Sequence, residues 1–417
     1  MHFYFKVKGD IINRKIFLYV KAFSDLGTFM DLIAINVLMY AATGSATWLA
    51  ATMAVRTLGG VISSLFSGVL ADSFDRRKIM IWTDVFRAVI ILCLIPFPNP
   101  IMILIVCFLI GLTSSFFAVS YSAEIPQIFG QDKVLETNAL ISRLTSISLV
   151  FGFISAGVIT DFLGYQVTLL IDAATYIISA VVLLKMKWKT TVPVEKIAIA
   201  NGFKEKLYTF VRDLKEVHSF IMLAPMLLMV NIVFLVGAFA GASHNLGIPL
   251  LAENINTDNQ SFYYGLIWGV WGIGSVLATI LLPKLRVMQG KRLYFTFFIS
   301  AMLMSAGFIT FLSNVNLWIV LPFAFFTGVF DACFTTLHAT ILQKTDNHIR
   351  GRIFGVGMLL KSLGFALGFV VAPILLKALS LPKMVWFFHG TLITTSIIIM
   401  IYSVGSRKKT AEIKQNI

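Results

Sequence analysis

Two aspartates in the first long apolar segment of this chain could carry protons across a membrane. Asp25 and Asp31 lie within residues 15–42, and Arg56 lies at about the middle of the next apolar segment. Charged side chains at the centre of a membrane-spanning helix are costly, so each is a candidate functional residue. Lys21 precedes Asp25 by four residues and can pair with it on one helix face. Asp31 has no such partner on its own helix, and Arg56 could neutralise either aspartate.

An unpaired carboxylate inside a membrane can change its protonation state near neutral pH, which is the property that a proton-driven transporter needs. We therefore predict Asp25, Asp31 and Arg56 as a proton-coupling site. A structural ion pair is the alternative role, and the spacing of Lys21 and Asp25 makes that alternative strongest for Asp25.

Long helices in a lipid bilayer must position these charges. The chain has 417 residues, of which 58% are hydrophobic and 13% are charged, and its mean hydropathy is +0.87. A soluble protein would carry about 25% charged residues, so the composition indicates an all-α integral membrane protein. Twelve apolar segments have close to the ~20 residues that cross a hydrocarbon core. They are 15–42, 46–71, 79–97, 101–123, 138–162, 165–185, 219–248, 262–283, 293–312, 317–341, 353–378 and 385–404.

The positive charge is distributed unevenly along the chain. The net charge is +14, and most of the 34 lysines and arginines lie in alternate gaps between the apolar segments. This positive-inside pattern predicts that both termini are cytoplasmic, and it argues against nucleic acid as a partner. The longest hydrophilic stretch separates six segments from six. We therefore predict two six-helix domains, 1–185 and 219–417, and a cytoplasmic loop, 186–218, in which Phe203 to Val217 is either a basic amphipathic helix or a plain linker.

A specific motif joins the second and third apolar segments. It reads Gly68-Val-Leu-Ala-Asp72-Ser-Phe-Asp75-Arg76-Arg77-Lys78. The basic cluster alone would follow from the positive-inside bias, but the Gly-x-x-x-Asp spacing before it is more specific. The motif resembles the loop between helices 2 and 3 of major facilitator superfamily transporters.

This resemblance implies a fold and a set of roles. The fold would be two pseudo-symmetric six-helix bundles with a substrate site between them near the middle of the bilayer. In the family this loop latches the two halves in the outward-facing state, a role that here would fall on Gly68, Asp72, Arg76 and Arg77. Asp84 and Arg87, three residues apart in the next helix, would lock the loop rather than touch substrate.

Departures from the usual motif narrow the resemblance. Ser73 and Asp75 stand where the family usually has arginine and glycine. Asp75, and the residues from Arg76 to Arg87, are similar to the branch that contains macrolide-efflux proteins, other drug:proton antiporters and siderophore exporters. The corresponding loop of the second half, from Leu282 to Lys291, lacks the aspartate.

Other charged residues lie in or near the apolar segments. Asp331 and Lys361 lie toward the middle of the tenth and eleventh segments and would form either a structural ion pair or a gating pair. Four more lie near predicted helix ends, where reaching the membrane surface is the default: Glu124, Arg143, Asp161 and Asp172.

Uncharged polar residues could face a substrate cavity. These candidates are Asn36, Asn231, His244, Asn245, Thr335, Thr336 and His338. A lone histidine in such a helix more often packs against a neighbour than binds a ligand. Small residues at four-residue spacing, in 265–272 and 364–368, are typical of close helix packing. Glycines at 152 and 157 parallel those at 364 and 368 and support two related halves. The three cysteines are scattered, and no metal site is expected.

The functional prediction follows from these features. The chain has no phosphate-binding loop and no convincing nucleophile and base, so we expect neither ATP-driven transport nor an enzyme. We predict a monomeric transporter of the bacterial-type plasma membrane that exports small amphiphilic compounds by alternating access. The proton gradient would replace any cofactor. The alternatives are a dedicated siderophore or metabolite exporter and a non-transporting membrane sensor or scaffold.

Overall fold

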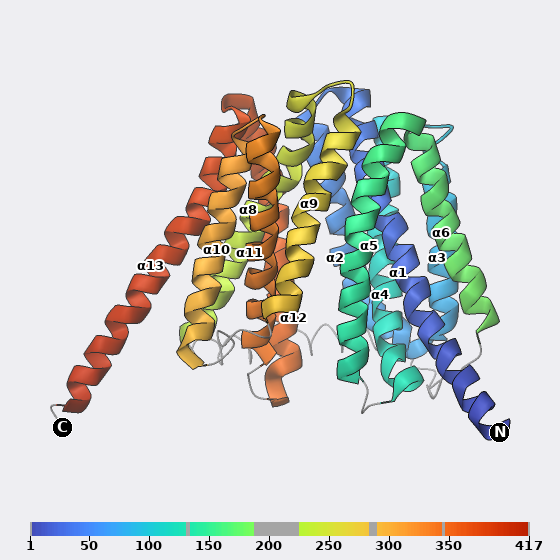
Figure 1. The fold of residues 1–417 in the computed structure, drawn as a ribbon, viewed down its shortest axis with the longest axis horizontal. Helices are drawn as coiled ribbons and strands as arrows, with labels where there is room; N and C mark the ends of the chain where they lie inside the picture. Colours follow the sequence, from blue (N-terminus) through green and yellow to red (C-terminus); the bar gives the residue numbers. More distant parts are fainter. Residues whose placement is uncertain (1, 131–133, 187–224, 283–289, 344–346, 416–417) are drawn as a thin grey trace. The chain divides into compact units, whose positions relative to one another are not determined.

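The computed structural model describes residues 2–130, 134–186, 225–282, 290–343 and 347–415. Nearly all of the predicted loop 186–218, including Phe203 to Val217, lies outside these ranges. Within them the chain forms twelve helices and no strand (Figure 1). They are α1 (His2–Thr43), α2 (Ala46–Ser73), α3 (Arg76–Leu92), α4 (Pro100–Phe129), α5 (Val134–Leu163), α6 (Tyr165–Lys185), α8 (Pro225–Ile255), α9 (Gln260–Leu281), α10 (Gly290–Leu312), α11 (Leu317–Gln343), α12 (Asn347–Ala378) and α13 (Leu381–Gln415).

Each of the twelve predicted apolar segments corresponds to one of these helices. Ten of the helices are long and apolar enough, over their described residues, to cross a membrane. Helix α3 has 17 residues and is shorter than a typical span. The predicted all-helical membrane fold is therefore confirmed, whereas the cytoplasmic position of both termini stays a prediction.

Glycines make the tight turns between successive helices. Gly44 has φ 57° between α1 and α2, and Gly164 has φ 87° between α5 and α6. Both values lie in the left-handed region, which residues with a Cβ rarely adopt. Both turns lie at the end of the bundle opposite to the start of α1 (Figure 1). These short connections make the joined helices antiparallel neighbours, as predicted.

Contacts divide the chain into two units. Unit 1 comprises Met1–Lys204 and Ile255–Gly269, and unit 2 comprises Glu205–Asn254 and Val270–Ile417. In unit 1, α2 packs on α4, α1 packs on α5 and α6, and α3 packs on α4 and α6. In unit 2, α10 packs on α11 and α13. The predicted domain boundaries at 185 and 219 stay a prediction.

Small residues bring paired helices close together in both units. A Cβ at Gly111 of α4 would collide with the backbone carbonyl of Arg56 in α2, and one at Gly328 of α11 would collide with that of Trp271 in α9. Gly152 of α5 likewise packs on the backbone of α1, as Gly364 of α12 packs on that of α8. The predicted close-packing role of the glycine at 364 is thus confirmed, and Gly152, which the sequence paired with it as part of a repeat, makes a similar contact in the first half.

Candidate proton-coupling site

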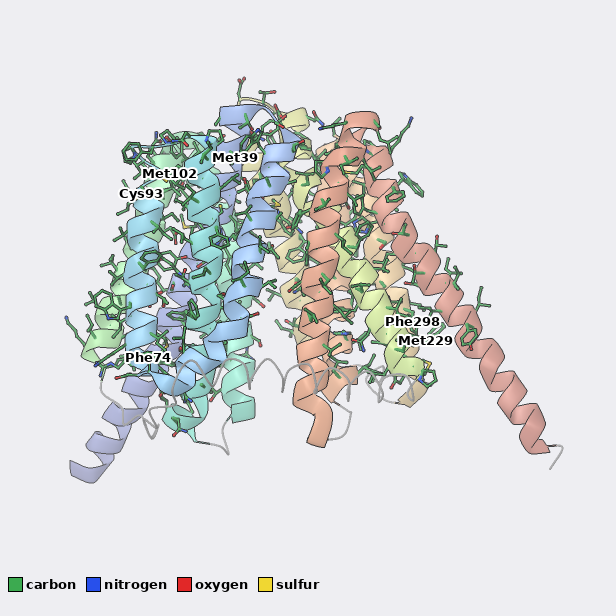
Figure 2. All side chains as sticks on the ribbon, turned by 180° about the vertical axis from the view of Figure 1, so that it is seen from behind. Met39, Phe74, Cys93, Met102, Met229 and Phe298 are labelled. Atoms are coloured by element: carbon green, nitrogen blue, oxygen red, sulfur yellow. The ribbon has the colours of Figure 1, made fainter. Side chains whose placement is uncertain are left out.

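Five charged residues of unit 1 lie along their helices between two apolar clusters of the bundle core: Lys21, Asp25, Asp31, Asp84 and Arg87. One cluster, which includes Met39, Ile91 and Cys107, lies toward the end with the glycine turns. The other includes Phe17, Met80 and Phe117. Figure 2 marks the two ends of the bundle, with Met39, Cys93 and Met102 near the first and Phe74 near the second. On α1, α3 and α4, these residues and Thr113 therefore form a polar layer between the two apolar clusters.

The best-defined element of this polar layer is an ion pair between Asp31 of α1 and Arg56 of α2. Arg56 donates from Nη1 to Asp31 Oδ1 at 2.7 Å and from Nη2 to Oδ2 at 3.2 Å. The Asp31 side chain is 0% exposed. Two parallel N–H···O bonds give such a pair both strength and a defined orientation. Of the two aspartates that Arg56 could neutralise, it therefore pairs with Asp31.

Asp25 has a different partner. Lys21, one turn earlier on α1, forms an ion pair and hydrogen bond with it, as the spacing predicts. Thr145 of α5 lies 3.4 Å from the second carboxylate oxygen. The ammonium of Lys21 also lies 5.8 Å from the ring centre of Phe117 and 5.7 Å from that of Tyr121, a favourable position for a cation. The two predicted coupling aspartates thus belong to separate ion pairs.

Asp84 and Arg87 join three helices in the same layer. Arg87 Nη1 lies 3.6 Å from Asp84 Oδ1, and its Nε donates to Thr113 of α4 at 3.2 Å. Ser179 of α6 donates to the other oxygen of Asp84 at 2.6 Å. The Arg87 guanidinium also lies 5.3 Å from the ring centre of Phe117. These contacts tie α3 to α4 and α6 in the core, and the predicted role in locking the loop stays a prediction.

Asp172 lies in the interior of α6 with 0% exposure. The prediction that it lies near a helix end is therefore wrong. Neither of its carboxylate oxygens has a hydrogen-bond partner among the described residues. A signal for this position exists in the sequence, because Asp172, Thr175, Tyr176 and Ser179 form a polar stripe at helical spacing. Such a stripe in an apolar helix indicates a buried polar face.

The motif between α2 and α3 forms contacts within unit 1. Gly68 and Asp72 lie in α2, but their side chains lie outside the described part of the chain. Arg76 Nη1 lies 3.7 Å from Glu124 Oε1, and Glu124 is fully buried. The expectation that Glu124 reaches the membrane surface was therefore wrong, because the carboxylate packs inward against this arginine. The latch between the two halves stays a prediction.

Arg77 secures the end of α6. Its Nε donates to the carbonyl of Leu183 at 2.8 Å, and its Nη2 donates to that of Leu184 at 2.5 Å. Carbonyls in the last turn of a helix have no partner within the helix, and a cation there also interacts favourably with the helix dipole.

We expect Arg77→Met to destabilise unit 1 by about 1–3 kcal/mol, because two charge-assisted hydrogen bonds are lost. The measurement is unfolding of the purified protein in detergent. Lys78→Met is the matched control, because Lys78 is exposed and its hydrogen bond to Asp75 comes from its backbone. Equal stability of the two variants would contradict the assigned role of Arg77.

The remaining predicted site residues do not converge. Asp331 is half-buried in α11 and Lys361 is exposed on α12, and the described residues form no ion pair between them. Asn231, Asn245 and Thr335 each donate to a backbone carbonyl of their own helix. A role for these residues in gating or in a substrate cavity stays a prediction.

Three other cavity candidates contact neighbouring helices. Asn36 donates to the hydroxyl of Tyr264 at 3.0 Å. His244 lies 3.4 Å from His389 and stacks on Phe308 at 3.8 Å. The third, His338, is buried and stacks on Phe234 with 3.5 Å between ring centres. Both predicted histidines therefore pack against neighbouring side chains in unit 2, which is the role expected for a lone histidine. Thr336 of α11 is half-buried.

The sequence model of the Major Facilitator Superfamily matches residues 18–369, which is most of the chain. The chain belongs to the major facilitator superfamily. The resemblance of the loop motif is thereby confirmed at the level of the family. As a member of this family with many apolar helices, the protein is a multi-pass transporter of the plasma membrane, and transporters of this family are not enzymes.

Relatives of this major facilitator protein include exporters and an antiporter. A candidate bacilysin exporter, BacE of Bacillus subtilis (strain 168), is 24% identical over 93% of this chain and 95% of the relative. A Na⁺, Li⁺, K⁺/H⁺ antiporter of Planococcus maritimus is 24% identical over 79% of this chain and 80% of the antiporter. The staphyloferrin A transporter of Staphylococcus aureus (strain NCTC 8325 / PS 47) is 24% identical over 62% of this chain and 64% of the relative.

The fold also resembles solved structures of the family. The crystal structure of the nucleoside transporter NupG superimposes with a TM-score of 0.72 over 93% of this chain and 98% of that one. The two sequences are 14% identical, so this likeness concerns the fold of the major facilitator transporters alone.

Proposed function

We propose that this transporter exports a small amphiphilic compound in exchange for protons. The observation that carries the proposal is the ion pair between the buried Asp31 of α1 and the half-buried Arg56 of α2. A buried ion pair is rarely a net gain in stability over apolar side chains of similar size. Its presence in the core of unit 1 therefore favours a functional role. The exporters and the cation/proton antiporter among the relatives support the same direction.

The proposed cycle uses this pair as a charge switch. A proton that enters from outside binds Asp25 or Asp31 and neutralises the carboxylate, which weakens its hold on the cation beside it. Lys21 or Arg56 is then free to take another partner, and the two halves rock to the inward-facing state. There the proton leaves and substrate binds. Asp72, Arg76 and Arg77 would control the rocking, and the cycle needs no cofactor and no second subunit.

A second candidate is a dedicated exporter of one metabolite with the same mechanism. The candidate bacilysin exporters and the staphyloferrin A transporter favour it, because each of their names gives a single compound. The two candidates differ only in the range of substrates. Both require coupling to protons, so one experiment can address them together.

Transport by purified protein in proteoliposomes under an imposed pH gradient tests the proposal. The probes are ethidium, erythromycin, bacilysin and staphyloferrin A, and a pH dye in the lumen reports coupled proton movement. We expect gradient-driven movement of at least one probe, with loss of coupling in Asp31→Asn or in the Asp25→Asn/Asp31→Asn double variant. Movement of several unrelated probes would support a polyspecific exporter, and movement of one metabolite alone would support a dedicated one.

The matched control is Asp75→Asn. Asp75 is exposed and accepts hydrogen bonds from the first turn of α3, and asparagine is an equally good helix N-cap. This variant should fold and transport like the wild type. Proton-coupled transport that survives in the double variant would refute the assigned coupling residues. A wild type that moves none of the probes with protons would count against the function itself.

A further inference from the structure

Among the described residues, the core of unit 1 contains one more carboxyl group than it has cations to pair with. These pairs are Asp25 with Lys21, Asp31 with Arg56, Asp84 with Arg87, and Glu124 with Arg76. Asp172 forms no ion pair there, and it is 0% exposed. If every carboxyl in this core were ionised, one negative charge would remain unpaired.

Helix α6 packs this carboxyl tightly against α1. A Cβ at Gly27 of α1 would collide with Asp172 Oδ1 and with Thr175 Oγ1. One turn further along α6, the hydroxyl of Tyr176 lies 3.0 Å from that of Thr28. The absence of a side chain at Gly27 is therefore what makes room for the carboxyl. The site is formed by tertiary packing and is not a loose side chain at a helix surface.

Charged groups from three helices act on Asp172. They are Asp31 on α1, Arg56 on α2, and Asp84 and Arg87 on α3. Helix α5, which also packs on α6, contributes the neutral Thr160, which lies 2.8 Å from Thr168 of α6. Both arginines already have carboxylate partners. The neighbourhood can thus hold Asp172 as a neutral acid, but it can hold an ionised Asp172 only if an arginine changes partner.

We propose that Asp172 is a proton-binding site, which holds the transported proton as a neutral carboxylic acid in the state described here. An isolated ionised carboxylate in an apolar interior is so costly that such a group is neutralised instead. Asp31 and Asp172 then compete for Arg56. This inference rests on the proposed function in one respect, namely that the bound proton is the one transported. The protonation of Asp172 itself can be measured without any substrate.

The exchange between the two aspartates conserves protons and charge. The O–H bond at Asp172 breaks and an O–H bond forms at Asp31, while Arg56 stays protonated and moves from the Asp31 carboxylate to that of Asp172. The proton and Arg56 thereby alternate between two carboxyls on different helices, α1 and α6: at each step one carboxyl carries the proton and the other pairs with the arginine. Release of the proton from Asp31 and uptake of another complete the exchange.

Infrared difference spectroscopy of the purified protein in nanodiscs tests proton binding directly. Spectra in H₂O and D₂O at neutral pH report the C=O stretch of protonated carboxylic acids. We expect such a band in the wild type and its loss in Asp172→Asn, a neutral variant of the same shape. Asp75→Asn, which changes an exposed carboxylate, should retain the band. A band that is unchanged in Asp172→Asn would overturn the proposal.

A second variant tests the competition for Arg56 without altering Asp172. In Asp31→Asn the arginine loses its partner, so we expect Arg56 to pair with Asp172, which then ionises, and the band to disappear. Persistence of the band in this variant would overturn the exchange through Arg56. If Asp172→Asn does not fold, persistence of the band in Asp31→Asn would still overturn the exchange.

Transport then separates a failure of this inference from a failure of the proposed function. With whichever probe the wild type moves, Asp172→Asn should lose gradient-driven accumulation and keep downhill exchange of labelled for unlabelled probe. Equal coupling in the wild type and in Asp172→Asn would overturn the inference alone. A wild type without proton coupling would refute the proposed function, while the infrared band would still decide whether Asp172 binds a proton.

Discussion

Replacement of Arg56 by methionine should destabilise this transporter severely. We expect Arg56→Met to lower the free energy of unfolding by about 3–5 kcal/mol, because it removes one partner of a buried ion pair and leaves the other charge uncompensated. Asp31 is 0% exposed and accepts both of its close hydrogen bonds from Arg56. Methionine keeps much of the length and the apolar stem of arginine, so the loss is chiefly one of charge and hydrogen bonds.

Denaturant unfolding of the purified protein in detergent measures this effect, and two further variants define its cause. Arg143→Met is the matched control, because Arg143 is an exposed arginine of the same unit, and it should behave like the wild type. The double variant Asp31→Leu/Arg56→Met should recover much of the stability, because apolar pairs often replace buried ion pairs without loss. If the double variant is as unstable as Arg56→Met alone, the cost does not come from an orphaned carboxylate.

A leucine at Gly111 should be nearly as damaging, through packing and not through charge. A Cβ at this position would collide with the carbonyl oxygen of Arg56 and lie 3.2 Å from the backbone nitrogen of Gly60. Backbone atoms cannot rotate away as a flexible side chain can, so α2 and α4 would have to separate. We expect Gly111→Leu to cost about 3 kcal/mol or more, at the upper end for overpacked cores.

The same unfolding measurement tests this prediction, with Gly390→Leu as the control. Gly390 lies in α13, and a Cβ there would meet no atom within 4 Å. Because Arg56 lies on the displaced segment of α2, Gly111→Leu should also lower proton-coupled transport in proteoliposomes. If Gly111→Leu is as stable as Gly390→Leu, α2 and α4 can separate at this contact at a lower cost in free energy than the structure indicates.

The sequence alone determined the twelve apolar segments, although α1 and α13 continue beyond the predicted ends at 15 and 404. An apolar segment of bilayer length must form its backbone hydrogen bonds internally, so length and composition suffice to predict a spanning helix. The residues 165–185 illustrate this, because the predicted segment has the bounds of α6. The pairing of Lys21 with Asp25 was equally predictable, since both partners lie on one helix and its geometry is regular.

Tertiary structure decided the partners that lie on different helices. Arg56 could have neutralised Asp25 or Asp31, and only the packing of α1 on α2 selects Asp31. The sequence places Asp172 along α6, but not on the face that α1 covers. That burial depends on Gly27, far away in the chain, which leaves room for the carboxyl. Helical periodicity is a local property, whereas the charge balance of a bundle core depends on which helix faces meet, and that is set by packing.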